Sequence, residues 1–127
     1  MNYLQVTARF RLHRENLDEF KKYARECLAL VKERDQDTIQ YDWFFNEDET
    51  ECVVHEQYPD SASLLEHIAN VNSALSKLIE MSEFSAEIYG EPSRQFLEAT
   101  SNLDVRTYSF FQGAVTSDFA SSNEQIM

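Results

Sequence analysis

The chain has 127 residues, 43% of them hydrophobic, which is enough for one domain with a single core but not for two. Its 23 acidic residues outnumber the 11 basic ones and give a formal net charge of -12, which repels nucleic-acid phosphates and anionic membrane surfaces. The sequence shows neither a run of about 20 apolar residues that would span a membrane nor a signal-peptide pattern. These features predict a cytoplasmic protein that binds neither nucleic acid nor membranes.

The first predicted elements are a strand and a helix. Polar and apolar residues alternate from Gln5 to Leu12, as in a strand with one buried face. A helix follows to about Arg34, and Asn16 together with Glu19 matches a capping box at its start.

The next elements form a predicted hairpin. Strands over Thr38–Phe45 and Glu51–Tyr58 flank a polar turn at residues 46–50. The first of these strands carries aromatic side chains on both faces: Tyr41, Trp43 and Phe45 on one, Phe44 on the other.

The two cysteines lie in different kinds of element. Cys27 falls in the helical pattern and Cys52 in a strand, with no CxxC or Cys/His spacing suited to zinc. We therefore expect two buried free thiols, and neither a disulfide nor a metal site.

The second half of the chain begins with helical spacing after Pro59. Asp60 or Ser61 is the expected cap, and residues 70–73 are expected to divide the region into two short helices with a bend. A fourth strand over Phe84–Tyr89, a helix containing Phe96, Leu97 and Ala99, and a fifth strand over Val105–Phe111 follow. We predict one domain over residues 1–114 and a disordered tail over residues 115–127.

The order of elements indicates the fold. Strand, helix, strand, strand, helix, strand is the split βαβ pattern of an α+β ferredoxin-like sheet, here with a C-terminal helix and strand added. Both main helices cover one face of such a sheet and leave the other face open. Because the second strand carries aromatics on both sides, we expect the open face to pack against a second copy in a homodimer.

Four short stretches resemble the antibiotic biosynthesis monooxygenase family. They are Val6-Thr7-Ala8-Arg9-Phe10-Arg11, Gln40-Tyr41-Asp42-Trp43, Val53-Val54-His55-Glu56-Gln57-Tyr58 and Leu64-Leu65-Glu66-His67-Ile68. The resemblance covers about residues 6–89, and residues 89–93 look like a subgroup with an added helix and strand. It implies a dimeric α/β barrel in which each subunit holds a pocket between its sheet and its helices.

The resemblance also implies a candidate chemistry. Some family members oxygenate phenols or hydroquinones without a metal or flavin, so the expected substrate is a small aromatic or quinol-like molecule and no cofactor is expected. Other relatives degrade haem or serve as accessory modules, and a non-catalytic ligand-binding or assembly module therefore remains the alternative.

His67 and Glu56 are the candidate catalytic residues. The resemblance places His67 on a helix facing the sheet, where a neutral imidazole accepts a phenolic proton near neutral pH. The alternative is a structural hydrogen bond that fixes the helix. Glu56 would orient His67 or a substrate hydroxyl, and its alternatives are a structural hydrogen bond or an ion pair across the dimer with Arg9 or Arg11. His55 belongs to the opposite strand face, and His13 is expected to be solvated.

Four further residues are candidates for substrate binding. Tyr41 and Trp43 share a strand face and would form a stacking wall, unless they serve only the core or the dimer interface. Asn72 stands where oxygenating and haem-degrading relatives often have a second His, and Tyr58 stands where haem degraders have a Trp. These departures disfavour haem, and they leave Asn72 able to hold a substrate hydroxyl but not to take its proton.

Overall fold

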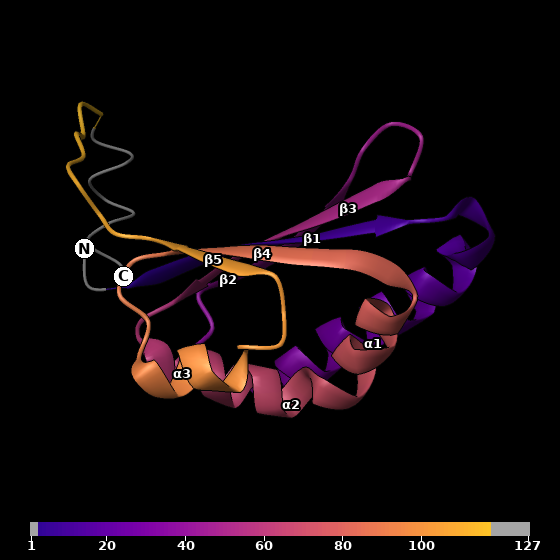
Figure 1. Cartoon of the computed structure of the whole chain (residues 1–127), viewed down its shortest axis with the longest axis horizontal. Coiled ribbons are helices and arrows are strands. Elements are labelled where there is room, and N and C mark those ends of the chain that lie inside the picture. Colours follow the sequence, from indigo (N-terminus) through magenta and orange to yellow (C-terminus); the bar gives the residue numbers. More distant parts are fainter. Residues whose placement is uncertain (1–2, 118–127) are drawn as a thin grey trace.

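The computed structural model describes residues 3–117, which form a sheet with helices on one side (Figure 1). The elements in chain order are β1 (Leu4–Leu12), the 3-10 turn η1 (Arg14–Asn16), α1 (Leu17–Arg34), β2 (Gln40–Phe45), β3 (Glu51–Tyr58), α2 (Ser61–Glu80), β4 (Ser82–Tyr89), α3 (Arg94–Ala99) and β5 (Val105–Tyr108). No helix within these residues is long and apolar enough to cross a membrane.

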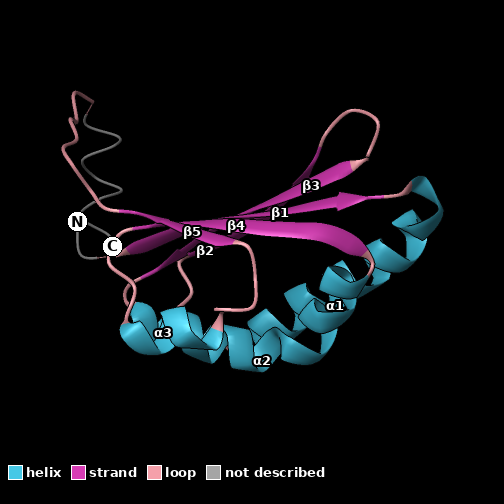
Figure 2. Cartoon of the chain, in the orientation of Figure 1, coloured by secondary structure: helices cyan, strands magenta, loops and turns pink. Residues whose placement is uncertain are grey.

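The sheet has the strand order β2-β3-β1-β4-β5, seen nearly edge-on in Figure 2. The pairs β2–β3, β3–β1 and β1–β4 are antiparallel, whereas β5 runs parallel to β4 at the edge. The first four strands with α1 and α2 give the predicted ferredoxin-like fold. The chain reaches the parallel position of β5 by crossing under the sheet through α3.

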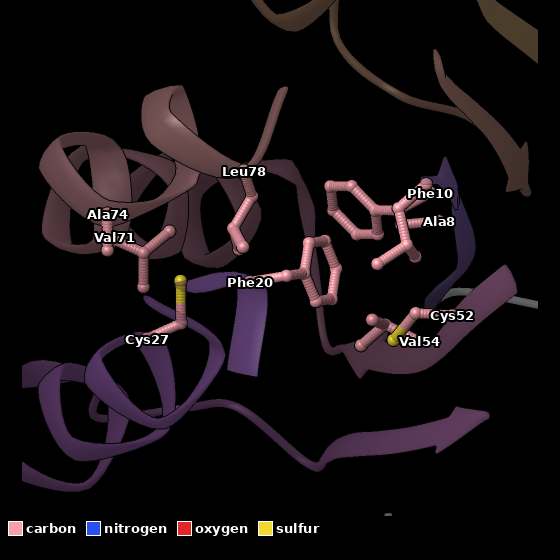
Figure 3. Close-up of a cluster of buried hydrophobic side chains, with 10 residues drawn as sticks. Ala8, Phe10, Phe20, Cys27, Cys52, Val54, Val71, Ala74 and Leu78 are labelled. Carbon is pink, nitrogen blue, oxygen red and sulfur yellow. The ribbon is translucent and has the colours of Figure 1, made fainter. Parts of the chain in front are cut away.

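The core lies between the sheet and the two long helices. Alternate residues of β1, from Leu4 to Leu12, are buried, as the period of two predicts. Phe10 lies edge-on to Phe20 of α1 at 5.4 Å and stacks with Trp43 of β2 at 6.1 Å between ring centroids. Figure 3 shows the buried part of this core, in which Phe10 and Phe20 face each other and Cys27 points toward Val71 and Ala74 of α2. Both cysteines are buried free thiols, as predicted.

The predicted bend in the second helical region is wrong, because α2 is one continuous helix from Ser61 to Glu80. Val71, inside the stretch read as a break, is fully buried, and Ala74 and Leu78 continue the same stripe. Residues 70–73 contain no Pro or Gly, so burial of Val71 keeps that turn helical. Asp60 caps the helix by accepting a hydrogen bond from the Ser63 amide at 2.8 Å, as predicted.

Two smaller predictions also differ from the structure. The Asn16 side chain caps no amide of α1, because η1 places Asn16 in a helical backbone conformation (φ -96°, ψ 0°) rather than the extended one that a cap requires. The fifth strand ends at Tyr108 instead of Phe111. Of the tail predicted over residues 115–127, the part from residue 118 onward lies outside the described residues.

The face of the sheet away from the helices, which we call the open face, is mostly polar over β1 and β4. Arg9 lies 3.5 Å from Glu51 and 3.4 Å from Glu87, joining three strands.

Exposed aromatic side chains lie on both sides of this face. Phe44 of β2 is 51% exposed and packs against His55 with ring centroids 5.3 Å apart. Tyr108 of β5 is 44% exposed and stacks on Tyr89 of β4 at 5.5 Å. Aromatic side chains therefore lie on the β2–β3 side and on the β4–β5 side of the open face, with the ion pairs of Arg9 between them.

The packing of the two layers generates a stability prediction. Leu78→Ala removes a fully buried side chain of the core, and we expect the free energy of unfolding to fall by about 2 to 5 kcal/mol. Leu97→Ala is the matched control, since Leu97 is 42% exposed on α3 and should cost less than about 1 kcal/mol. Urea unfolding of both variants makes the measurement. Equal losses would contradict a core centred between the sheet and α2.

Candidate functional site

A cavity of about 420 Å³ lies between the sheet, α2 and α3. Its wall is chiefly apolar and comes from β1, β3, β4, β5 and both helices, with Tyr41 and Trp43 of β2 at one side. Glu56 and His67 are its ionisable groups beside the sheet, while Asn72 and Glu80 line it further along α2. No Lys or Arg is among the described residues that line it.

Strand register and helix packing bring the polar groups of the site together. Glu56 of β3 lies opposite Val6 of β1 and Tyr41 of β2, so these three side chains share the face beneath the sheet. His67 projects from α2 toward that row and is 3% exposed. Its Nε2 lies 3.6 Å from Oε1 of Glu56, which is too far for a hydrogen bond between them.

Tyr58 completes the sheet side of the site. Its hydroxyl donates a hydrogen bond of 2.5 Å to Oε1 of Glu56, two residues earlier on β3. Tyr58 is fully buried and does not line the cavity, so it contacts Glu56 and the ring of His67, 5.2 Å away between centroids. The structure therefore gives Tyr58 a place behind the site and not a surface for ligand.

Asp35 is a member of this cluster that the sequence reasoning missed. It follows the last residue of α1, and its Oδ2 lies 2.8 Å from Nδ1 of His67. The same carboxylate accepts hydrogen bonds from Thr38 Oγ1 at 2.6 Å and Asn70 Nδ2 at 2.8 Å. In the sequence, an Asp three residues before a Thr indicates a turn at residues 35–38. This local pattern does not indicate a contact with His67, 32 positions further along the chain.

The two carboxylates have opposite electrostatic settings. Burial raises the pKa of Glu56, and nearby His67 with the Tyr58 hydrogen bond only partly offsets it. Burial also acts against ionisation of Asp35, but the hydrogen bonds from Thr38, Asn70 and His67 outweigh it and lower the pKa of that carboxyl. Asp35 is thus the ionised member, and Glu56 the one that holds a proton more readily.

Tyr41 and Trp43, which share a strand face, line one side of the cavity. The Tyr41 ring lies edge-on to His67, with centroids 4.7 Å apart, and edge-on to Trp43 at 5.6 Å. The Tyr41 hydroxyl and the Cys27 thiol are paired by a side-chain hydrogen bond. Burial raises the pKa of the Cys27 thiol to about 12 and that of Tyr41 above its ordinary value, so neither group ionises at neutral pH.

The remaining candidates lie away from the cluster. Asn72 is exposed on α2, just over one turn beyond His67, and lines the cavity. Its Oδ1 accepts a hydrogen bond from Ser76 at 3.5 Å, and among the described residues no hydrogen bond joins it to the other polar candidates. His55 and Arg9 lie on the open face. Within one chain the sheet separates Glu56 from Arg9 and Arg11, so an ion pair across the dimer stays a prediction, while Glu56 does accept a structural hydrogen bond from Tyr58.

The search for metal ligands covers residues 3–117. No group of three or more His, Cys, Asp or Glu side chains in this range is arranged to hold a metal ion. Asp35, His67 and Glu56 lie in a row, with the imidazole between the carboxylates, so they do not surround a common point.

Comparison with known proteins identifies the fold. No protein-family model matches the sequence, and no curated protein matches it. Among solved structures, MupZ from Pseudomonas fluorescens is similar with a TM-score of 0.76 and 17% identity, over 91% of this chain and 96% of that one.

Two further structures connect the fold with oxygenases. SnoaB from Streptomyces nogalater, a cofactor-independent oxygenase, gives a TM-score of 0.61 at 14% identity, over 73% of this chain and 96% of that one. A candidate antibiotic biosynthesis monooxygenase from Caulobacter crescentus gives 0.60 at 19% identity, over 68% and 85%. The chain has the fold of the antibiotic biosynthesis monooxygenases, and identities this low carry the fold alone.

The buried setting of Glu56 generates a prediction about pH. Between about pH 4.3, where an unfolded Glu titrates, and its raised folded pKa, the folded chain keeps a proton that the unfolded chain loses. This group therefore makes the wild type less stable as pH rises through that window, by about 1.4 kcal/mol for each unit between the two pKa values. The Glu56→Gln variant has no carboxyl to titrate and so does not lose stability in this way, and its amide oxygen can still accept the hydrogen bond from Tyr58.

We expect Glu56→Gln to gain stability relative to the wild type as pH rises from acid to neutral. Denaturant unfolding of both proteins at a series of pH values measures the difference, in which the contributions of other shared groups cancel. Parallel stability curves for the two proteins would show that Glu56 titrates normally in the folded state.

Proposed function

We propose that this protein is a cofactor-independent monooxygenase that oxidises a small aromatic or quinol-like compound with dioxygen. The observation that carries the proposal is the buried His67–Glu56 pair at an aromatic-sided cavity inside a fold shared with a cofactor-independent oxygenase. In this role His67 accepts the substrate proton, Glu56 faces the same hydroxyl, and Tyr41 with Trp43 flank the ring.

The cavity suits a ligand of this class. Its volume of about 420 Å³ falls within the range of small-molecule sites, roughly 300 to 1,000 Å³. An apolar wall with few polar groups favours a flat, uncharged molecule and excludes bulk water, which strengthens proton transfer and charge interactions inside. Asn72 provides a hydrogen-bonding group further along α2 for a second substrate oxygen.

The distance between His67 and Glu56 supports the acid–base roles. A separation of 3.6 Å leaves Nε2 and Oε1 unbonded to each other, so a substrate hydroxyl can approach both. Removing its proton gives a phenolate electron-rich enough to pass an electron to dioxygen. For a hydroquinone, one oxygen atom replaces a ring hydrogen as hydroxyl and the other leaves as water. The substrate supplies all four electrons and ends as a hydroxylated quinone.

The second candidate is a non-catalytic dimeric module that binds a hydrophobic ligand. The observation in its favour is that the polar groups beside the cavity already satisfy one another: Tyr58 donates to Glu56, and His67 is bonded to Asp35. A network of this kind also occurs in buried structural sites. Tight ligand binding without turnover in air would distinguish this module from the enzyme.

We also propose that the functional unit is a homodimer joined through the open face. Phe44 is half-exposed there, beside His55 and the partly buried Val53, and a two-fold pair covers such an apolar area with its own copy. The ion pairs of Arg9 and Arg11 on the same face supply polar groups for the surrounding contact.

The proposed reaction predicts oxygen uptake. Incubation with a panel of hydroquinones and naphthols should consume one dioxygen per product, and ¹⁸O₂ should leave one labelled oxygen in the product. His67→Ala should lower kcat by about 10² to 10⁴-fold, the range that a general base contributes. His13→Ala is the matched control, because His13 is exposed at the end of β1 and should leave kcat unchanged.

The controls separate enzymatic oxygenation from spontaneous oxidation. Heat-inactivated protein reports the background, in which quinone forms without labelled oxygen on the ring carbon. If active protein and this background give the same products and oxygen uptake across the panel, the monooxygenase proposal is wrong. Full activity of the His67 variant would remove only the role given to that residue.

The proposed dimer predicts a change in association. Phe44→Glu places a charge on the open face in place of an apolar ring, and we expect dimer dissociation to become at least about tenfold easier. Leu97→Glu, on the exposed side of α3, should leave association unchanged. Sedimentation velocity over a concentration series measures both, and a wild-type chain that stays a single subunit throughout would contradict the dimer.

A further inference from the structure

The Asp35 carboxylate joins two segments that are distant in the sequence. It accepts a hydrogen bond from Thr38 Oγ1 in the loop after α1. On neighbouring turns of α2, His67 Nδ1 and Asn70 Nδ2 are hydrogen-bonded to the same carboxylate. Its side chain is 4% exposed and is not part of the cavity wall. Asp35 therefore acts on any bound ligand only through His67.

We propose that Asp35 is a positioning residue that holds the proton of neutral His67 on Nδ1, so that the lone pair of Nε2 faces Glu56 and the cavity. The catalytic meaning of this arrangement rests on the proposed function, whereas the placement of the proton does not. The role differs from the one predicted for Glu56, since the residue that orients His67 is Asp35.

The hydrogen-bond geometry decides which ring nitrogen carries the proton. An ionised carboxylate only accepts, so at 2.8 Å from Oδ2 the Nδ1 atom must be the donor. Glu56 makes no competing bond at Nε2, because its Oε1 is 3.6 Å away and already accepts from Tyr58. The hydrogen bonds that lower the pKa of Asp35 also keep it in the accepting form.

The surroundings of the imidazole leave no other group to reverse this assignment. Among the described residues, the ring contacts that the structure shows for His67 are those with Tyr41 and Tyr58. The Tyr58 hydroxyl is directed to Glu56 and that of Tyr41 to Cys27. The titratable groups that face His67 are therefore Asp35 and Glu56 at opposite ring nitrogens, with the two tyrosines beside the ring.

A purely structural role for Asp35 is the competing explanation. The same three hydrogen bonds attach the loop after α1 to α2, and their loss would destabilise the fold whatever the tautomer of His67. Asn70→Ala gives the matched control, because it removes one of these hydrogen bonds without changing a donor or acceptor of the imidazole.

The first experiment uses the wild-type protein. Long-range ¹H–¹⁵N correlation spectra of ¹⁵N-labelled protein across a pH series distinguish the two neutral tautomers and the imidazolium. We expect the Nδ1–H tautomer for His67. A ring protonated on Nε2 alone, or on both nitrogens throughout the series, would overturn the proposal without reference to any activity.

The second experiment compares Asp35→Asn with Asn70→Ala. The new amide can donate to Nδ1, so Asp35→Asn should move the proton of His67 to Nε2 and lower kcat by about 10² to 10⁴-fold with little change in KM. Asn70→Ala should keep the wild-type tautomer and a kcat within about twofold. Equal thermal destabilisation in both variants, with the tautomer unchanged in both, would show that Asp35 is only a tether.

The two experiments separate failure of this inference from failure of the proposed function. If no compound is oxidised but the spectra show the Nδ1–H tautomer in the wild type and its loss in Asp35→Asn, the positioning role stands and the monooxygenase proposal falls. If turnover is found and Asp35→Asn keeps both the tautomer and kcat, the positioning role falls alone.

Discussion

The structure depends on keeping three ionisable side chains out of water beneath one sheet. Asp35, His67 and Glu56 form a row in which the imidazole separates the two carboxylates, at 2.8 and 3.6 Å. A buried charge without a partner costs several kcal/mol, so each member requires the others. Thr38 and Asn70 donate to Asp35 and Tyr58 donates to Glu56, and this row with its donors fixes how α2 lies against the sheet.

Burial of the apolar core offsets the free-energy cost of burying these ionisable groups. Phe10, Phe20 and Trp43 pack in edge-on and stacked contacts beneath the sheet, and Val71 and Leu78 bring α2 against α1. Burial of side chains of this size contributes about 1.5 to 3 kcal/mol each. Phe10 and Trp43 also line the cavity, so these two rings both stabilise the fold and exclude water from the proposed reaction site.

Local patterns in the sequence were sufficient for the strands and for part of the site. The alternation along β2 predicts that Tyr41 and Trp43 share a face, and the register of β2 on β3 brings Glu56 to that same face. Patterns fail where tertiary packing decides: Val71 keeps α2 continuous through a polar stretch. Asp35 was missed for the same reason, since only the packing of α1 on α2 brings it to His67.

The charges around the cavity limit how a phenolate could form there. No Lys or Arg among the described residues lines the wall, so a new negative charge has no cation to meet except the protonated His67. An ionised Glu56 would repel that charge, whereas a Glu56 that keeps its proton would donate a hydrogen bond to it. Burial favours the protonated form of Glu56, and the donors around Asp35 favour its ionised form. Two carboxylates in one site thus divide into a proton donor and a permanent acceptor, which lets one histidine take a proton without leaving two like charges beside the anion.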